Sequence, residues 1–198
     1  MKKPGIADIL PLSPLQEGLL FHALYDTDGP DVYTTQLTLH LEGHLDTDRL
    51  RTAASTLLSR HPNLKAAFHT RPNNPPIQII PTTTHLPFNE IDLTHLTPTQ
   101  QTTQLTHITN QERHHRFNPT NPPLIRYTLI HTTPTTHHLL ITNHHILLDG
   151  WSMPLMVREL LTLYTTNSNT HTLPPTTPYR EYLTWLHQQD PTTSLTTW

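Results

Sequence analysis

The sequence contains no cysteine and only five glycines among its 198 residues. The lack of cysteine excludes disulfide bonds and thiolate-ligated metal sites, and no glycine-rich phosphate-binding loop is present. No apolar run approaches the roughly 20 residues that a membrane-spanning helix needs, and no basic cluster predicts nucleic-acid binding. Residues 1–14 are too short and too interrupted by proline for a secretory signal. We therefore expect a soluble cytoplasmic protein that forms one domain, or one lobe of a larger one.

Charge is also scarce, at 14% of the residues with a formal net charge of −3. Threonine, histidine and proline stand where most proteins use lysine, glutamate or alanine. Segments such as TTTH and HTTPTTHH resemble low-complexity sequence, yet the apolar positions between them stay regular, so we interpret them as solvent-exposed filler. With 17 histidines in the chain, a single histidine is a weak indication of function.

Hydrophobic periodicity predicts strands that alternate with helices. The expected helices cover residues 14–24, 47–60, 98–115, 153–164 and 179–189. Ser13 and Asp46 are the predicted N-caps of the first two, and Thr97 with Gln100 predicts a capping box for the third. The expected strands cover residues 31–41, 64–69, 77–80, 88–93, 124–131 and 137–144. This order predicts an α/β or α+β fold with a mixed sheet, and the polar, proline-rich residues 165–178 predict a linker or crossover loop.

The stretch TNHHILLDGWSMP, residues 142–154, follows the last predicted strand. Side chains alternate along a strand, so His144 and His145 would face opposite ways if the extended conformation continues to residue 145. Only one of them could then project into a given cavity. Ser152 is the predicted N-cap of the next helix, and Gly150 would permit an unusual backbone before it. A strand end beside a helix N-terminus is a common setting for chemistry in sheet proteins.

Three interpretations of this stretch stay open on the local pattern alone. A His-x-x-x-Asp pair could coordinate a divalent ion, but two ligands are too few and no third lies at an obvious spacing. The histidines could instead satisfy buried backbone groups, with Asp149 capping the helix at Ser152. One histidine could also perform acid–base chemistry near neutral pH, with Asp149 holding the loop.

Four stretches together resemble the core motifs of condensation domains from nonribosomal peptide synthetases. They are LSPLQEGLLFH (12–22), RHPNLKAAF (60–68), HHILLDG (144–150) and YREYLTW (179–185), which resemble the first, second, HHxxxDG and fourth motifs. They occur in the family's order and cover essentially the whole chain. The departures from the usual residues are Lys65 for arginine, Ala67 for threonine and Glu181 for aspartate. Lysine lacks the planar fork of arginine, so an ion pair at that position would be weaker.

The resemblance implies an α/β (α+β) chloramphenicol-acetyltransferase-like lobe, with a mixed β-sheet flanked by helices. Family members arrange two such lobes in a V, and their later motifs are missing here, so we expect the N-terminal half of a condensation domain, as a truncated or split piece. Residues 1–178 would form this lobe, and residues 179–198 a crossover helix toward a missing C-terminal lobe. Trp185 on that helix would then expose hydrophobic surface.

The resemblance also implies an amide-forming acyltransferase with an active site that is incomplete in this chain. The amino group of an acceptor aminoacyl thioester would attack a donor acyl or peptidyl thioester. Both substrates are carried on phosphopantetheine arms, so no directly bound cofactor and no metal is expected. The implied partners are upstream and downstream peptidyl carrier proteins, the C-terminal lobe and an adenylation domain, with no nucleic acid or membrane. We expect the chain alone to be inactive.

By the same resemblance, His145 is the catalytic residue, as a general base or as a positioner of the amine. His144 is expected to be buried and structural, and Asp149 to hold the loop through an ion pair. Gly150 is expected to allow the backbone to approach the substrate closely. The complete set of predicted supporting residues is His144, Asp149, Gly150, Trp151 and Arg60.

The first motif and DGWSMP look most like domains that join a D-configured donor to an L-acceptor. Epimerisation domains share the double histidine, but residues 151–154 fit condensation better, and heterocyclisation domains carry acids in place of the histidines. A non-catalytic recruiting or docking domain would be expected to lose His145 or Gly150, and both are intact. A stand-alone acyltransferase using His145 and Asp149 is disfavoured by His144 and the other three motifs.

Overall fold

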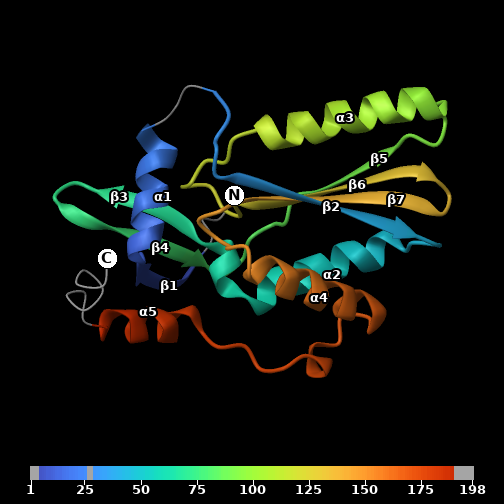
Figure 1. Ribbon diagram of the computed structural model, residues 1–198. Coiled ribbons are helices and arrows are strands. Elements are labelled where there is room, and N and C mark those ends of the chain that lie inside the picture. Colours follow the sequence, from blue (N-terminus) through green and yellow to red (C-terminus); the bar gives the residue numbers. More distant parts are fainter. Residues whose placement is uncertain (1–4, 26–28, 190–198) are drawn as a thin grey trace.

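The structure is a computed structural model that describes residues 5–25 and 29–189 (Figure 1). The end of the predicted crossover segment, residues 190–198, therefore lies outside the described part. The helices are α1 (Pro14–Tyr25), α2 (Thr47–Arg60), α3 (Pro98–His114), α4 (Ser152–Thr165) and α5 (Tyr179–His187), with the short 3-10 helices η1 (Pro62–Lys65) and η2 (Thr170–Thr172). The strands are β1 (Ile6–Pro11), β2 (Thr34–Glu42), β3 (Ala67–Arg71), β4 (Asn74–Pro81), β5 (Phe88–Asp92), β6 (Ile125–Thr133) and β7 (Thr136–His144).

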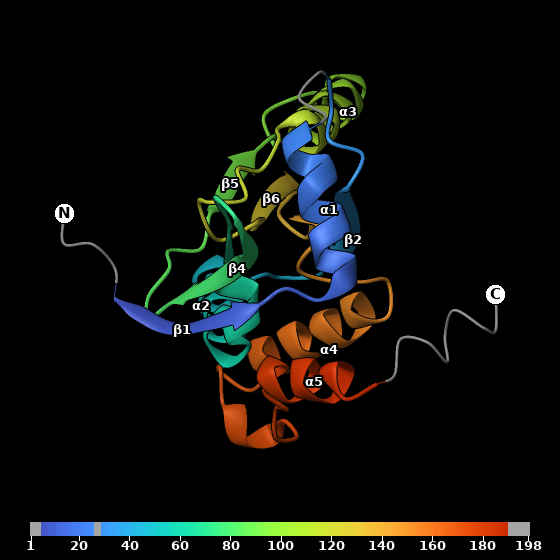
Figure 2. The same cartoon turned by 90° about the vertical axis from the view of Figure 1, so that its left-hand side faces the viewer.

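The described strands form two sheets. The larger sheet has the order β2-β7-β6-β5, in which β5 and β6 are parallel and the other pairs antiparallel. It is the mixed sheet that the sequence predicts. The smaller sheet, β1-β4-β3, is antiparallel throughout. Figure 1 shows α3 on one face of the larger sheet and α2 with α4 on the other, while Figure 2 shows α5 below β1.

The alternation of side chains along β7 separates two cores. Leu139 and Ile141 face α2 and α4, where they pack with Leu50 and Leu160, whereas Leu140 faces α3 on the opposite side of the sheet. Full burial of each such leucine contributes roughly 1.5–3 kcal/mol. The predicted alternation of side chains along this strand is therefore confirmed, and it determines which face of the sheet each side chain of β7 occupies.

A third core joins the smaller sheet to α1 and α5. Its members include Leu10, Leu19, Phe68 and Leu183, and it also contains Ile146, which follows the double histidine. Helix α5 is thus attached to the described lobe through a buried leucine, while Trp185 on the same helix is 55% exposed, as predicted. No described helix is both long and apolar enough to cross a bilayer.

Local capping signals are confirmed, but one strand was missed. The Asp46 carboxylate accepts from the Arg49 N–H at 3.0 Å, and Thr97 forms the predicted capping box with Gln100. The sequence pattern did not predict β1, because its alternation covers only Ile6–Pro11 between two prolines. This strand is stabilised by pairing with the distant β4, a contact that no local pattern reveals.

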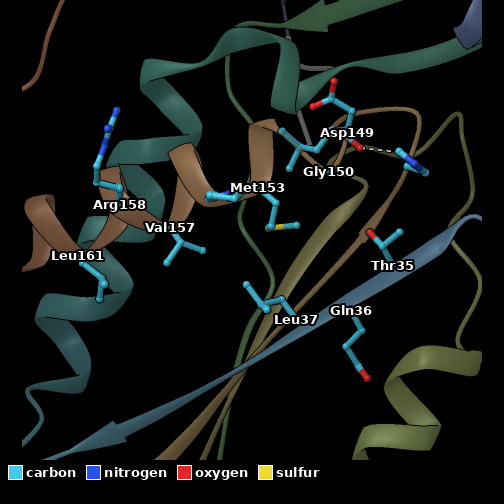
Figure 3. A pocket seen from close by; sticks show the side chains of 12 residues that line it. Thr35, Gln36, Leu37, Asp149, Gly150, Met153, Val157, Arg158 and Leu161 are labelled. Atoms are coloured by element: carbon cyan, nitrogen blue, oxygen red, sulfur yellow. Dashed lines mark hydrogen bonds between the residues drawn. The ribbon is translucent and has the colours of Figure 1, made fainter.

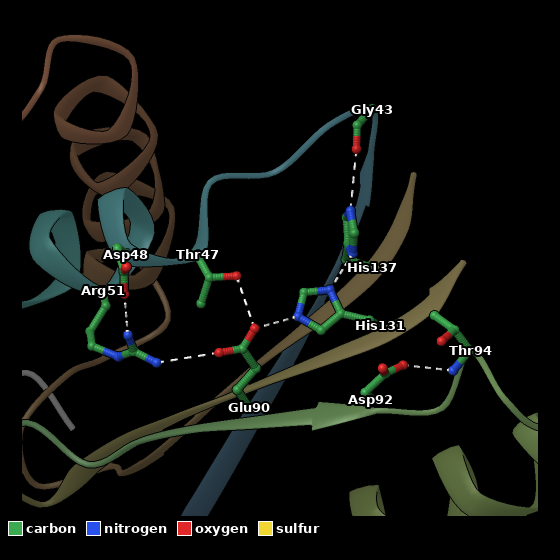
Figure 4. Close-up of polar contacts among 9 residues, drawn as sticks. All are labelled: Gly43, Thr47, Asp48, Arg51, Glu90, Asp92, Thr94, His131 and His137. Carbon is green, nitrogen blue, oxygen red and sulfur yellow. Dashed lines mark hydrogen bonds and ion pairs between the residues drawn. The ribbon is translucent and has the colours of Figure 1, made fainter. Parts of the chain in front are cut away.

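The view that the isolated histidines are exposed filler is wrong for the β6–β7 hairpin (Figure 4). His131 and His137 contact each other through their Nδ1 atoms at 2.7 Å, while their Nε2 atoms contact Glu90 at 2.8 Å and the Gly43 carbonyl at 3.2 Å. Both ends of this chain are acceptors, so with both imidazoles neutral at least one of the three contacts lacks a hydrogen. Burial alone would raise the pKa of Glu90, but the hydrogen bonds from His131 and Thr47 and the charges of His131 and Arg51 together outweigh burial, so that pKa is lowered.

Candidate active site

The double histidine lies where β7 ends and the chain turns toward α4. The strand stops at His144, and residues 145–147 form a turn closed by the Leu147 N–H to the His144 carbonyl at 3.1 Å. The predicted end of the strand at His144 is confirmed, and the condition that the strand continues to residue 145 is not met. The two histidines are still separated, because the turn redirects His145 while its backbone N–H donates to the Tyr33 carbonyl at 2.8 Å.

His144 is fully buried, with a relative exposure of 0%. Its Nδ1 accepts a hydrogen bond from the Ile146 N–H at 3.0 Å, so the neutral ring carries its proton on Nε2. Nε2 lies 3.1 Å from Oδ2 of Asp31, with an N–H alignment too poor for a strong hydrogen bond, so this contact is mainly electrostatic. Burial lowers the pKa of His144, although the charge of Asp31 partly opposes that shift. This geometry suits a structural role.

Asp31 was not predicted as a site residue. Its side chain is buried, and Oδ1 accepts from the Tyr33 N–H at 2.9 Å, two residues along the chain. This is the Asx-turn geometry that aspartate favours. Asp31 was expected to begin a strand, but the strand begins at Thr34. The aspartate instead orients the loop whose Tyr33 carbonyl holds the backbone of His145.

The ring of His145 forms part of a cavity wall, and only its Nδ1 has a hydrogen-bond partner within the described residues. The Nδ1–H donates to the Leu148 carbonyl at 2.7 Å, which leaves a lone pair on Nε2. No hydrogen bond to Nε2 occurs among the residues that the structure describes. A neutral imidazole held in this tautomer can accept a proton, or a hydrogen bond from an amine, at Nε2.

Two cavities meet at His145. The apolar cavity has a volume of about 680 Å³ and lies between β2 and α4 (Figure 3), where its wall includes Leu37, Met153 and Val157. The second cavity, called the polar cavity because polar groups form about half of its lining, has a volume of about 300 Å³ and is lined by Ser13, Gln16, Tyr179 and Tyr182 together with leucines. His145, Leu148 and Asp149 line both cavities. The turn thus forms a wall shared by an apolar and a polar compartment.

Asp149 caps α4, as one of the interpretations of this stretch predicts, and does not form the ion pair that the resemblance implies. Its Oδ1 accepts hydrogen bonds from the Ser152 N–H at 2.7 Å and from the Ser152 hydroxyl at 2.6 Å. These bonds lower the pKa of Asp149. Ser152 is the first residue of α4, so Asp149 provides the cap that was assigned to Ser152. No ion pair to Asp149 occurs within the described residues. Lys65, at the position where the family usually has arginine, donates to the Thr82 carbonyl at 3.4 Å.

Gly150 and Trp151 follow at the rim of the site. Gly150 does not adopt a positive φ, so the expected unusual backbone is not observed. A Cβ added there would meet nothing within 4 Å, so no described neighbour requires glycine at this position. Trp151 is 87% exposed and packs little against the described residues. The roles of both residues toward a substrate stay predictions.

Arg60 lies away from the two cavities that His145 lines. At the end of α2, its Nε donates to Glu159 of α4 at 3.0 Å, and its NH2 group donates to the Pro174 carbonyl. His61 contacts the same Glu159 oxygen at 2.7 Å. Arg60 therefore fixes α4, which forms one wall of the apolar cavity. Among the residues described, no group of three or more histidine, aspartate or glutamate side chains could hold a metal ion.

Comparison with known proteins identifies the family. A family model described as "Condensation domain" matches residues 6–196. The chain belongs to the condensation domain family. One of the linear gramicidin synthase proteins of Brevibacillus parabrevis is 32% identical over 100% of the chain, which covers 4% of that protein. Surfactin synthase subunit 3 of Bacillus subtilis (strain 168) is 30% identical over 99% of the chain, which covers 16% of it. The chain thus spans a small part of these condensation-domain relatives.

Solved condensation domains share the fold of this chain. The starter condensation domain of rhizomide synthetase RzmA matches with a TM-score of 0.71 and 20% identity, over 86% of this chain and 40% of that one. The first condensation domain of the calcium-dependent antibiotic synthetase, in complex with a substrate analogue, matches with a TM-score of 0.72 and 22% identity, over 86% and 40%. The predicted mixed α/β fold is confirmed, and the chain corresponds to less than half of each domain.

Proposed function

We propose that this chain is the N-terminal part of a condensation domain that forms an amide bond between two thioester substrates. The acceptor amine attacks the donor carbonyl carbon, the new C–N bond forms, the C–S bond breaks, and the donor thiol leaves. The amine loses one proton in the process. Both substrates would arrive on the phosphopantetheine arms of carrier proteins. One arm would carry the acceptor aminoacyl group, and the other would carry the donor acyl or peptidyl group.

The observation that carries this proposal is the position of His145 on the wall shared by the apolar and polar cavities. A reaction between two tethered substrates needs two compartments that meet at the reacting atoms. The lone pair on Nε2 is available to the amine, either to take its proton or to orient it by a hydrogen bond. The apolar cavity suits the side chain of one substrate, and the polar cavity suits a more hydrophilic arm.

The proposal extends to the partners. A donor and an acceptor carrier protein would deliver the substrates, an adenylation domain would load the acceptor, and a C-terminal lobe would supply the remaining wall. Because the chain covers 40% of the solved condensation domains that it resembles, we expect the isolated 198-residue chain to form no amide bond. By resemblance to its motifs, the donor would have the D configuration.

The experiment uses the complete protein that contains this chain, with donor and acceptor carrier proteins loaded and products followed by mass spectrometry. We expect the donor acyl group to appear in amide linkage on the acceptor carrier, with the donor thiol released. Exchange of the α-hydrogen without transfer would indicate epimerisation instead. Transfer to free amines but not to a loaded carrier would indicate a stand-alone acyltransferase, and carrier binding without any reaction would indicate a recruiting domain.

A further inference from the structure

Gln16 is a buried glutamine near the start of α1 whose amide reaches the turn that carries His145. It is 8% exposed, and its Nε2 donates to the Ile146 carbonyl at 3.2 Å, across 130 residues of sequence. Its Oε1 accepts from the Ser13 N–H at 3.1 Å and from Nε2 of Gln78 at 3.3 Å. The Ser13 N–H is a backbone donor, so it suffices to direct Oε1 toward Ser13 and to place Nε2 on Ile146.

The turn is held at three backbone points by three different elements. The Tyr33 carbonyl takes the N–H of His145, the ring of His144 takes the N–H of Ile146, and Gln16 donates to the carbonyl of Ile146. The first two contacts hold backbone N–H groups, those of His145 and Ile146. Gln16 holds the backbone carbonyl of Ile146, two residues before Leu148, whose own carbonyl accepts from Nδ1 of His145. Asp149 makes no ion pair within the described part of the chain, so no ion pair of Asp149 helps to hold the turn there.

We propose that Gln16 is a positioning residue for amide formation, acting through the Ile146 carbonyl on the orientation of His145. The inference rests on the proposed function. Gln16 also lines the polar cavity beside His145. Its Oε1 and one N–H of its amide bond protein groups, and it acts on His145 through the N–H that bonds the Ile146 carbonyl. A buried hydrogen bond that fixes a catalytic side chain affects the rate more than substrate binding, because misplacement by about 1 Å can cost 100-fold.

A merely structural role is the alternative, because Gln16 also belongs to the N-terminal cap of α1. Its backbone N–H donates to the Ser13 hydroxyl at 3.2 Å. Gln78 provides the matched control, since its Nε2 bonds both the Pro11 carbonyl and Gln16 without touching the turn. Gln78→Met removes a buried amide from the same network and leaves the bond to Ile146 possible.

The first measurement compares Gln16→Met and Gln78→Met in the complete protein, with kcat and KM determined below the melting temperature of each variant. For Gln16→Met we expect kcat to fall by about tenfold or more with KM changed by less than about twofold, the pattern of a lost transition-state contact. Gln78→Met should keep kcat within about twofold of the parent protein. Equal kcat values for the two folded variants would overturn the proposal.

Gln16→Glu adds a pH signature that a loss of folding would not produce. Burial raises the pKa of a carboxyl group, and only the protonated acid has an O–H that can donate to the Ile146 carbonyl. The kcat of Gln16→Glu, divided by that of the parent protein at the same pH, should therefore rise as the pH falls. A ratio that stays flat or falls would contradict the positioning role.

A third measurement does not depend on catalysis. In the 198-residue chain labelled with ¹⁵N-histidine, the ring of His145, assigned by its loss in His145→Gln, should show one tautomer with the proton on Nδ1. Gln16→Met, or Gln16→Glu at high pH if the methionine variant does not fold, should show a mixture of tautomers. An unchanged His145 ring would refute the inference about Gln16, whereas absence of amide product from the parent protein would refute the proposed function alone.

Discussion

Nε2 of His144 lies 3.1 Å from the carboxylate of Asp31, and both side chains are buried. The adjacent His145 shares neither this partner nor this environment, because its ring lines two cavities. The double histidine therefore consists of one residue that belongs to the protein interior and one whose ring lines two cavities. Their different surroundings lead to different expected effects of substitution.

Asp31→Ala should lower the free energy of unfolding, measured in urea, by about 1–3 kcal/mol, because it leaves buried polar groups on Tyr33 and His144 without a partner. Asp31→Asn should lower the free energy of unfolding by less, since the amide oxygen of the asparagine can still accept from the Tyr33 N–H. Asp48 is a matched control: its side chain is 91% exposed and pairs only with Arg51 at the surface, so Asp48→Ala should change stability by less than about 1 kcal/mol. Equal losses for the two alanine variants would contradict a buried Asp31–His144 pair.

The stability of the chain should fall as the pH drops below about 6.5, the ordinary pKa of histidine. Burial lowers the pKa of His144 in the folded state, so the unfolded chain binds the proton first and unfolding becomes easier as the pH falls toward the folded pKa. His137 and His138, whose pKa values burial also lowers, contribute with the same sign. The free energy of unfolding, measured in urea at pH values from 8 to 5, should decrease less steeply with falling pH for His144→Phe than for the parent chain. Identical slopes would show that His144 does not titrate in this way.

Asp149→Ala should lower the free energy of unfolding by about 1 kcal/mol, the usual effect of removing a helix cap. Asp149→Asn should retain part of this contribution, because an amide oxygen can still accept from the Ser152 N–H. Urea denaturation at low and high salt distinguishes a cap from an ion pair, since a hydrogen-bonded cap largely survives salt screening. A stability difference between Asp149→Ala and the parent that vanishes at high salt would favour the ion pair that the family resemblance implies.

The features predicted correctly are those encoded by neighbouring residues. The caps at Ser13, Asp46 and Thr97 bond groups three residues away, and the helices and most strands follow from hydrophobic spacing. The separation of His144 from His145 was also predicted, but for a partly wrong reason, because a turn and not a continued strand separates them.

The features missed depend on contacts between distant parts of the chain. Gln16 bonds Ile146 from α1, and Asp31 contacts His144 from the loop before β2. Nothing in the sequence around either residue specifies its partner. The ion pair expected at Asp149 came from the resemblance, whereas the structure shows a cap between neighbouring residues, with Asp149 accepting from Ser152.

The central claim is that His145 acts on the acceptor amine. The most direct measurement is the single-turnover rate of amide formation by the complete protein with both carrier proteins loaded, comparing His145→Ala with His107→Ala. His107 is an exposed histidine on α3 that lines neither cavity at His145. We predict that His145→Ala slows amide formation by about 100-fold or more without a change in melting temperature, while His107→Ala keeps the parent rate. An unchanged rate in folded His145→Ala would contradict the account.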